Sequence, residues 1–119
     1  MAVKSYRELL VWQKGIALVE KVYLLTTEFP EHEKFGLESQ LRRAAVSIPS
    51  NIAEGQAREH SGEFRRFLYI TLGSLAEVDT QLEIAVQLRY VEKDIITEIT
   101  NLILELRKML FGLINKLPL

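Results

Sequence analysis

Five arginines give this sequence its clearest capacity to bind another molecule. They fall within 25 residues that contain no lysine: Arg42, Arg43, Arg58, Arg65 and Arg66. The planar guanidinium group suits bidentate contacts with phosphate or carboxylate. Three glutamates, Glu54, Glu59 and Glu63, lie among the arginines. Two interpretations therefore stay open. Arg43, Arg58, Arg65 and Arg66 form a phosphate-contacting surface, or the arginines serve ion pairs within the chain.

A stripe of small polar side chains accompanies the arginines. At about 100° per residue, one face of the segment 37–58 collects Gln40, Arg43, Ser47, Ser50, Asn51, Glu54 and Arg58. The apolar residues of the same segment share another face: Leu37, Leu41, Ala44, Ile48 and Ile52. Short hydroxyls and amides suit fixed hydrogen bonds to a packed neighbour or a bound partner. Ser47 and Ser50 have a second expected role, which is to support backbone carbonyls freed by Pro49.

Neither catalysis nor metal binding finds support in the residue pattern. The chain has no cysteine, and Phe29 and Ala57 stand three residues before the two histidines, so the Glu-x-x-His signature of metal-binding bundles is absent. A hydrolase that uses Glu54 as a general base is a third hypothesis, less favoured than a Glu54 bonded to a nearby arginine or to Asn51. We expect a protein without catalytic residues, metal, cofactor or small-molecule substrate.

The composition indicates one soluble domain. The chain has 119 residues, a net charge of −1 and a sequence pI of about 6.1, so bulk positive charge does not explain any binding to nucleic acid. No apolar run exceeds four residues, and the first residues lack the apolar core of a signal peptide. The expected location is therefore the cytoplasm, without membrane contact.

The apolar periodicity predicts an all-α fold with four helices over residues 6–28, 37–58, 61–88 and 92–116. Short connections favour an up-down-up-down four-helix bundle that occupies residues 1–119 as a single domain. Ser5 and Ser61 are the expected N-caps, and a turn is expected at Arg89–Tyr90. Pro49 should kink the second helix. A strand over 44–48 fits less well because the surrounding pattern does not alternate.

Surplus apolar surface on the first and fourth helices predicts association between copies of the chain. A second candidate interface runs along the third helix at spacings of three and four: Tyr69, Gly73, Ala76, Thr80 and Ile84. Glycine inside a helix costs about 1 kcal/mol relative to alanine, so close approach of another backbone at Gly73 would give that residue a purpose. The alternative, a glycine tolerated on an exposed face, stays open.

Three segments of the chain closely resemble one bacterial protein family. They read YRELLVWQKGIALVEKVY, FPEHEKFGLESQLRRAAVSIPSNIAEG and EFRRFLYITLGSLAEVDTQLEIAVQL, and the run SIPSNIAEG from Ser47 to Gly55 is the most specific. The family is that of the four-helix bundle proteins encoded in 23S rRNA intervening sequences. The resemblance covers about 6–90 and, more loosely, the fourth helix.

The resemblance implies an up-down four-helix bundle that assembles as a homopentamer. A similar protein is the accessory variability determinant of diversity-generating retroelements, a basic pentamer that binds nucleic acid and reverse transcriptase. This chain differs from such basic relatives in its net charge of −1. The first functional hypothesis is a non-enzymatic, homo-oligomeric accessory protein that binds RNA or DNA. The alternative is an oligomeric scaffold whose partners are proteins.

Overall fold

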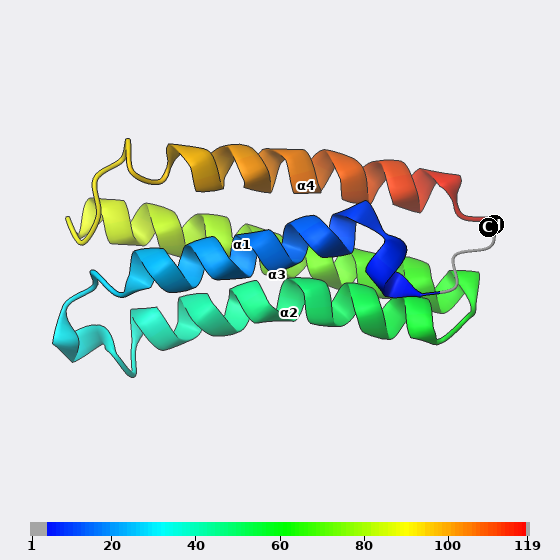
Figure 1. Ribbon diagram of the computed structural model, residues 1–119, viewed down its shortest axis with the longest axis horizontal. Helices are drawn as coiled ribbons and strands as arrows, with labels where there is room; N and C mark the ends of the chain where they lie inside the picture. Colours follow the sequence, from blue (N-terminus) through cyan, green and yellow to red (C-terminus); the bar gives the residue numbers. More distant parts are fainter. Residues whose placement is uncertain (1–4, 119) are drawn as a thin grey trace.

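The computed structural model describes residues 5–118, which form an up-down-up-down bundle of four α-helices, as predicted. The described elements are the 3-10 turns η1 (Tyr6–Glu8) and η2 (Glu31–Glu33) and the helices α1 (Leu10–Thr26), α2 (Leu37–Ala57), α3 (Ser61–Gln87) and α4 (Thr97–Lys116). Each helix runs antiparallel to the next along a body of 45 × 24 × 20 Å (Figure 1). Contacts join α1 with α2, α2 with α3, α3 with α4 and α4 with α1, so α1 and α3 occupy diagonal corners.

Several predicted helix boundaries were wrong. Leu9 has extended backbone dihedrals, which separate η1 from α1, and Ser5 caps the short turn through its hydroxyl, 3.1 Å from the Arg7 amide. His60, rather than Ser61, occupies the N-cap position of α3 and makes no side-chain bond there. The first three helices also end one or two residues earlier than expected, at Thr26, Ala57 and Gln87.

The largest error concerns the start of α4, which begins at Thr97 instead of residue 92. The preceding residues form turns, with hydrogen bonds from the Ile95 amide to the Glu92 carbonyl and from the Thr97 amide to the Asp94 carbonyl. These turns leave Ile95 exposed and bury Ile96 instead. The apolar period of residues 92–116 predicts a core seam that includes Ile95 and Ile99, and for Ile95 this prediction is wrong. The predicted turn at Arg89–Tyr90 is confirmed, and Arg89 has a left-handed φ of 63°.

Helix α2 continues through Pro49, whose ring is accommodated by a glycine on α1. A Cβ atom added at Gly15 would lie 3.4 Å from the Pro49 Cβ, so the two helices are already in van der Waals contact there. The approach of α2 to α3 is closer still. A Cβ atom at Gly55 would lie only 2.6 Å from the Phe67 Cβ. These contacts fix how α2 sits between its two neighbours.

The interior is almost entirely aliphatic. Its largest fully buried side chains are Leu18, Leu41, Ile48, Ile52, Leu68, Leu82, Leu106 and Leu110. Two buried threonines satisfy their hydroxyls within their own helices: Thr26 donates to the Val22 carbonyl and Thr71 to the Phe67 carbonyl, both at 2.8 Å. Within residues 5–118, no helix is both long enough and apolar enough to cross a membrane.

Candidate functional site

Some residues of the polar stripe of α2 lie at the contact between α2 and α3, which we call the seam, and others lie on the outer surface. The Ser47 hydroxyl lies 2.6 Å from the Ala44 carbonyl and 2.7 Å from the Ser74 hydroxyl of α3. Asn51 donates its amide to the Ser47 carbonyl at 2.8 Å. Ser50 and Glu54 are exposed. Ser47 therefore joins the two helices, and the carbonyl that it supports is that of Ala44, one residue before the carbonyl freed by Pro49.

A shallow polar groove follows this seam. It encloses about 270 Å³ and is lined by Gln40, Arg43, Ala44, Ser47, Ser74, Glu77 and Gln81. The Gln81 Oε1 atom is buried without a hydrogen-bond donor in the described part of the chain. Arg43 comes from α2 and Glu77 from α3, and no ion pair joins them in the described chain. Gln40 and Ser47 thus have α3 as their neighbour, a fact that the helical period of α2 alone does not reveal.

Two of the predicted phosphate-contacting arginines form an internal network at the α2–α3 turn. Arg58 contacts Glu54 at 2.9 Å and Glu63 at 3.3 Å, and Arg66 contacts Glu63 at 3.4 Å. Both guanidinium groups also lie about 5 Å from the centre of the Phe67 ring. The hydrogen bond to Glu54 raises the pKa of Arg58 above its ordinary value. About half of each side chain remains accessible to solvent.

The remaining arginines are used in three further ways. Arg65 donates to the carbonyls of Leu117 and Pro118 and so ties the start of α3 to the end of α4. Arg42 donates to the Thr26 hydroxyl at 2.8 Å, pairs with Glu38 and covers the Tyr23 ring. Arg43 is exposed and has no ion pair within residues 5–118. It lies about 22 Å along α2 from Arg58, at 1.5 Å per residue.

Charge is distributed unevenly along the bundle. When each helix is divided at its midpoint, the half that contains the α2–α3 turn comprises 5–18, 47–74 and 107–118. That half carries twice as many cations as anions, and the cations are Arg7, Lys14, Arg58, Arg65, Arg66, Arg107, Lys108 and Lys116. The four anions there are Glu8, Glu54, Glu59 and Glu63, which leaves a net charge of +4. We call it the basic half.

The opposite half comprises 19–46 and 75–106 and has twelve carboxylates against six cations, a net charge of −6. Its cations are Lys21, Lys34, Arg42, Arg43, Arg89 and Lys93. We call it the acidic half. The net charge near zero therefore conceals two ends of opposite sign. The division became visible only when the antiparallel topology had placed the end of α4 beside the start of α3.

The predicted stripe on α3 faces solvent along its whole length. Tyr69, Gly73, Ala76, Thr80 and Ile84 are all exposed, with 53% of the Tyr69 surface accessible. A Cβ atom at Gly73 would meet nothing within 4 Å. No contact within the described chain therefore accounts for this glycine.

The sequence did not predict a further exposed surface, which lies around Phe35. Phe35, which follows η2, is 91% exposed, and it borders a groove of about 440 Å³ on the outer side of α1 and α2. The groove is lined by Tyr23, Lys34, Phe35, Glu38, Ser39, Arg42, Arg43 and Val46. We call it the Phe35 groove. The sequence signal was an aromatic residue between a lysine and a glycine in a connection, where apolar residues normally find no cover.

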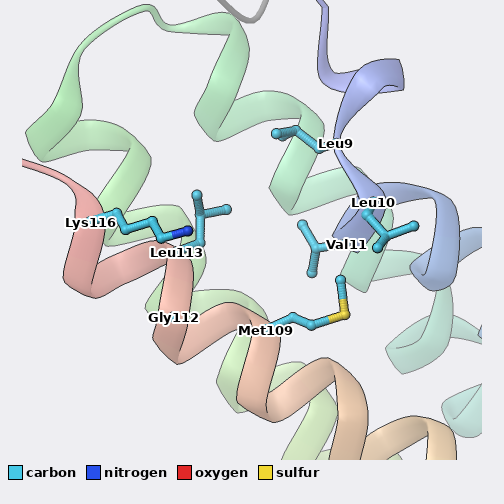
Figure 2. Close-up of a pocket in the computed structure, with 7 residues that line it drawn as sticks. All are labelled: Leu9, Leu10, Val11, Met109, Gly112, Leu113 and Lys116. Carbon is cyan, nitrogen blue, oxygen red and sulfur yellow. The ribbon is translucent and has the colours of Figure 1, made fainter. Parts of the chain in front are cut away.

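An apolar groove separates the start of α1 from the end of α4. It encloses about 360 Å³ between Leu9, Leu10, Val11, Met109, Gly112, Leu113 and Lys116 (Figure 2). Other exposed apolar side chains of these two helices are Ile16, Leu24, Leu104 and Phe111. The surplus apolar surface predicted for α1 and α4 is thus present.

Three titratable side chains, His32, Glu33 and Tyr90, form a small cluster that joins the α1–α2 connection to the α3–α4 connection in the acidic half. The Tyr90 hydroxyl donates to Glu33 at 2.7 Å, and the His32 Nε2 atom lies 3.3 Å from the Tyr90 oxygen. Glu33 also accepts from the Leu37 amide, and this bond, followed by that of Tyr90, lowers the pKa of Glu33. No group of three or more potential metal ligands occurs between residues 5 and 118.

Comparisons with known proteins yield a family and a fold. A family model described as 23S rRNA-intervening sequence protein matches residues 7–112. A crystal structure of a protein of unknown function from the S23 ribosomal protein family of Bacteroides thetaiotaomicron is similar, with 24% sequence identity and a TM-score of 0.79. The alignment covers 90% of this chain and 100% of that one. A search of curated proteins found no significant match.

Proposed function

The chain belongs to the 23S rRNA-intervening sequence protein family, and we propose that it is a non-enzymatic, self-associating bundle that contacts RNA through its basic half. The observation that carries the proposal is the net charge of +4 on that half. Nucleic-acid affinity depends on local cation density along a surface rather than on the total charge of a chain.

Self-association strengthens such a surface. A single basic half offers few phosphate contacts, but a symmetric assembly repeats each cation once per subunit. The exposed apolar side chains on α1, α3 and α4 support association, and the family resemblance favours five copies. Arg58 and Arg66 keep about half of their side chains accessible while Glu54 and Glu63 hold them in place. We propose that phosphate groups contact these arginines together with Lys108 and Lys116.

The second candidate is a protein scaffold without nucleic-acid binding. The observation that favours it is the internal pairing of Arg42, Arg58 and Arg66 with carboxylates of the same chain. In that case the arginines stabilise the fold and the α2–α3 turn. Binding of a polyanion separates the two candidates.

The test compares matched lysine substitutions at the two ends. Lys108→Glu in the basic half and Lys93→Glu in the acidic half each change an exposed lysine that has no ion pair among residues 5–118. Fluorescence anisotropy with a short single-stranded RNA, titrated between about 50 and 200 mM salt, should show weaker binding and a salt slope reduced by about 1–2 for Lys108→Glu. Lys93→Glu should bind as the wild type does.

The double variant Arg58→Ala with Arg66→Ala extends the test to two arginines of the basic half. It should weaken RNA binding while circular dichroism and sedimentation mass stay unchanged. A wild-type protein that binds neither RNA nor DNA at low salt would refute the proposal and leave the scaffold. Unfolding of the double variant would assign these arginines to the fold instead.

A further inference from the structure

The Phe35 groove displays an aromatic ring on a fixed support. The Glu33 carboxylate accepts hydrogen bonds from the Leu37 amide at 2.9 Å and the Tyr90 hydroxyl at 2.7 Å. Backbone bonds from the Glu33 amide to the Pro30 carbonyl and from the Gly36 amide to the Glu33 carbonyl close the same turn. Phe35 thus projects from a turn that is tied to both α2 and the α3–α4 connection. An apolar ring held this way loses little side-chain entropy when it is covered.

The groove is apolar at its centre and cationic at its edge. Tyr23 and Val46 expose about 40% of their surfaces beside Phe35. Lys34 and Arg43 have no ion pair in the described chain, whereas Glu38 is already paired with Arg42. A complementary occupant is therefore apolar and acidic, with side chains small enough to let its backbone lie close.

The outer face of α3 has these properties. From Phe67 to its end at Gln87, α3 contains no lysine or arginine, and the three charged residues of this stretch are Glu77, Asp79 and Glu83. Gly73, Ala76 and Thr80 give the face a flat centre, and Ile84 and Leu88 are exposed near its end. We infer that the Phe35 groove of one copy receives the outer face of α3 from the next copy. This inference rests on the self-association in the proposed function.

The two surfaces also lie at the same height along the bundle. The contact between Ser47 and Ser74 marks the level at which α2 and α3 meet, and the helices run in opposite directions from it (Figure 1). At 1.5 Å per residue, Arg43 is level with the region of Glu77 and Asp79, and Phe35 with the region from Ile84 to Leu88. Cations thus stand level with carboxylates, and the aromatic ring stands level with exposed aliphatic side chains.

Equal height has a consequence for symmetry. Two different patches generate a closed ring when a pure rotation relates successive copies and an open filament when a translation is added. Because the Phe35 groove and the face of α3 are level, a rotation about an axis parallel to the helices brings them together. The assembly that follows is a ring of parallel bundles, with every basic half on one side.

Mixing two damaged chains tests the inference. Phe35→Asp damages the groove, and Ile84→Asp damages the face of α3. Each variant alone should sediment at the mass of one chain, 13.7 kDa, with unchanged helicity, because both side chains are exposed. An equimolar mixture should recover a complex of two chains, since one intact groove and one intact face remain. A mixture without recovery would overturn the inference.

Leu24→Asp is the matched control on the outer side of α1, where 74% of the leucine surface is exposed. It should retain the wild-type mass. If Leu24→Asp dissociates the assembly and Phe35→Asp does not, the interface lies between α1 and α4 and the inference is wrong.

A charge exchange is an independent check. Lys34→Glu and Glu83→Lys should each lower the sedimentation mass, and their combination should restore it.

The readouts separate this inference from the RNA proposal. Loss of RNA binding with the ring intact would refute only the RNA contact. A wild-type mass of one chain at micromolar concentration would refute both the ring and the repeated basic surface.

Discussion

Two glycines, Gly55 on α2 and Gly73 on α3, show how differently the two sides of this helix pair are used. Gly55 sits in the seam, where a Cβ atom would lie 2.6 Å from the Phe67 Cβ. Gly73 lies on the outer face, where a Cβ atom would meet nothing within 4 Å. Packing within the chain explains the first glycine and leaves the second without a reason. The difference indicates that the seam stabilises the fold, while the outer face is available to a partner.

The largest effect is expected from a substitution that disrupts the seam between α2 and α3. Gly55→Ala forces a methyl group against the backbone-proximal Cβ of Phe67, so α2 and α3 must separate or shift. The free energy of unfolding should fall by about 1–3 kcal/mol, measured by urea denaturation. Gly112→Ala is the control, because nothing lies within 4 Å of a Cβ atom there. Equal stability of the two variants would contradict the close approach at Gly55.

Removal of the seam's hydroxyl contact comes next. Ser47→Ala removes the 2.7 Å partner of the Ser74 hydroxyl, and Ser74 is a residue with only 7% of its surface exposed. The free energy of unfolding should fall by about 1 kcal/mol. Ser50→Ala, a change of the same chemistry on the exposed side of α2, should not destabilise the protein. A double-mutant cycle with Ser74→Ala measures the coupling, and additive losses would refute the contact.

The outer face should respond in the opposite direction. In a Phe35→Asp background, where copies are expected to separate, Gly73→Ala should raise the free energy of unfolding by about 1 kcal/mol through helix propensity alone. In the wild-type background, Gly73→Arg should lower the sedimentation mass without loss of helicity, because a long charged side chain separates surfaces in close contact. An unchanged mass for Gly73→Arg would show that the face is merely exposed.

The smallest effect is expected at the contact between Tyr90 and Glu33, which joins the α3–α4 connection to the α1–α2 connection. Hydrogen bonds lower the pKa of Glu33 below its ordinary 4.5, so their stabilising effect is present above that value and is lost as the pH falls through the pKa in the folded protein. Tyr90→Phe should therefore destabilise the protein at neutral pH, with a difference from the wild type that shrinks below pH 4.5. Urea denaturation at several pH values measures this difference. A difference independent of pH would contradict the assignment to Glu33.

The fold could be predicted because the apolar period of each helix identifies a buried face without knowledge of its neighbours. That period could not say which helix lies beside the polar side chains of α2. The sequence therefore predicted a polar stripe that includes Gln40 and Ser47 but not the contact of these residues with α3. It also failed at Ile95, because turns before α4 shift the pattern by one residue and bury Ile96.

The arginines show the same limit at the candidate site. Their clustering in sequence was visible, but their partners come from three separate helices and from the end of the described chain. Phe35 was missed because a connection has no period against which an exposed aromatic stands out. The opposite charges of the two halves could be identified only from the topology, because each half combines residues from segments far apart in the sequence.

That polarity gives the protein a long-axis electric dipole. The macrodipoles of neighbouring antiparallel helices oppose one another, so the dipole arises mainly from side chains. A polyanion approaching in dilute salt is turned toward the basic end before any contact forms, and such steering acts chiefly on the association rate constant. The two ends thus differ in the speed with which they meet a charged partner, even where the final contacts are few.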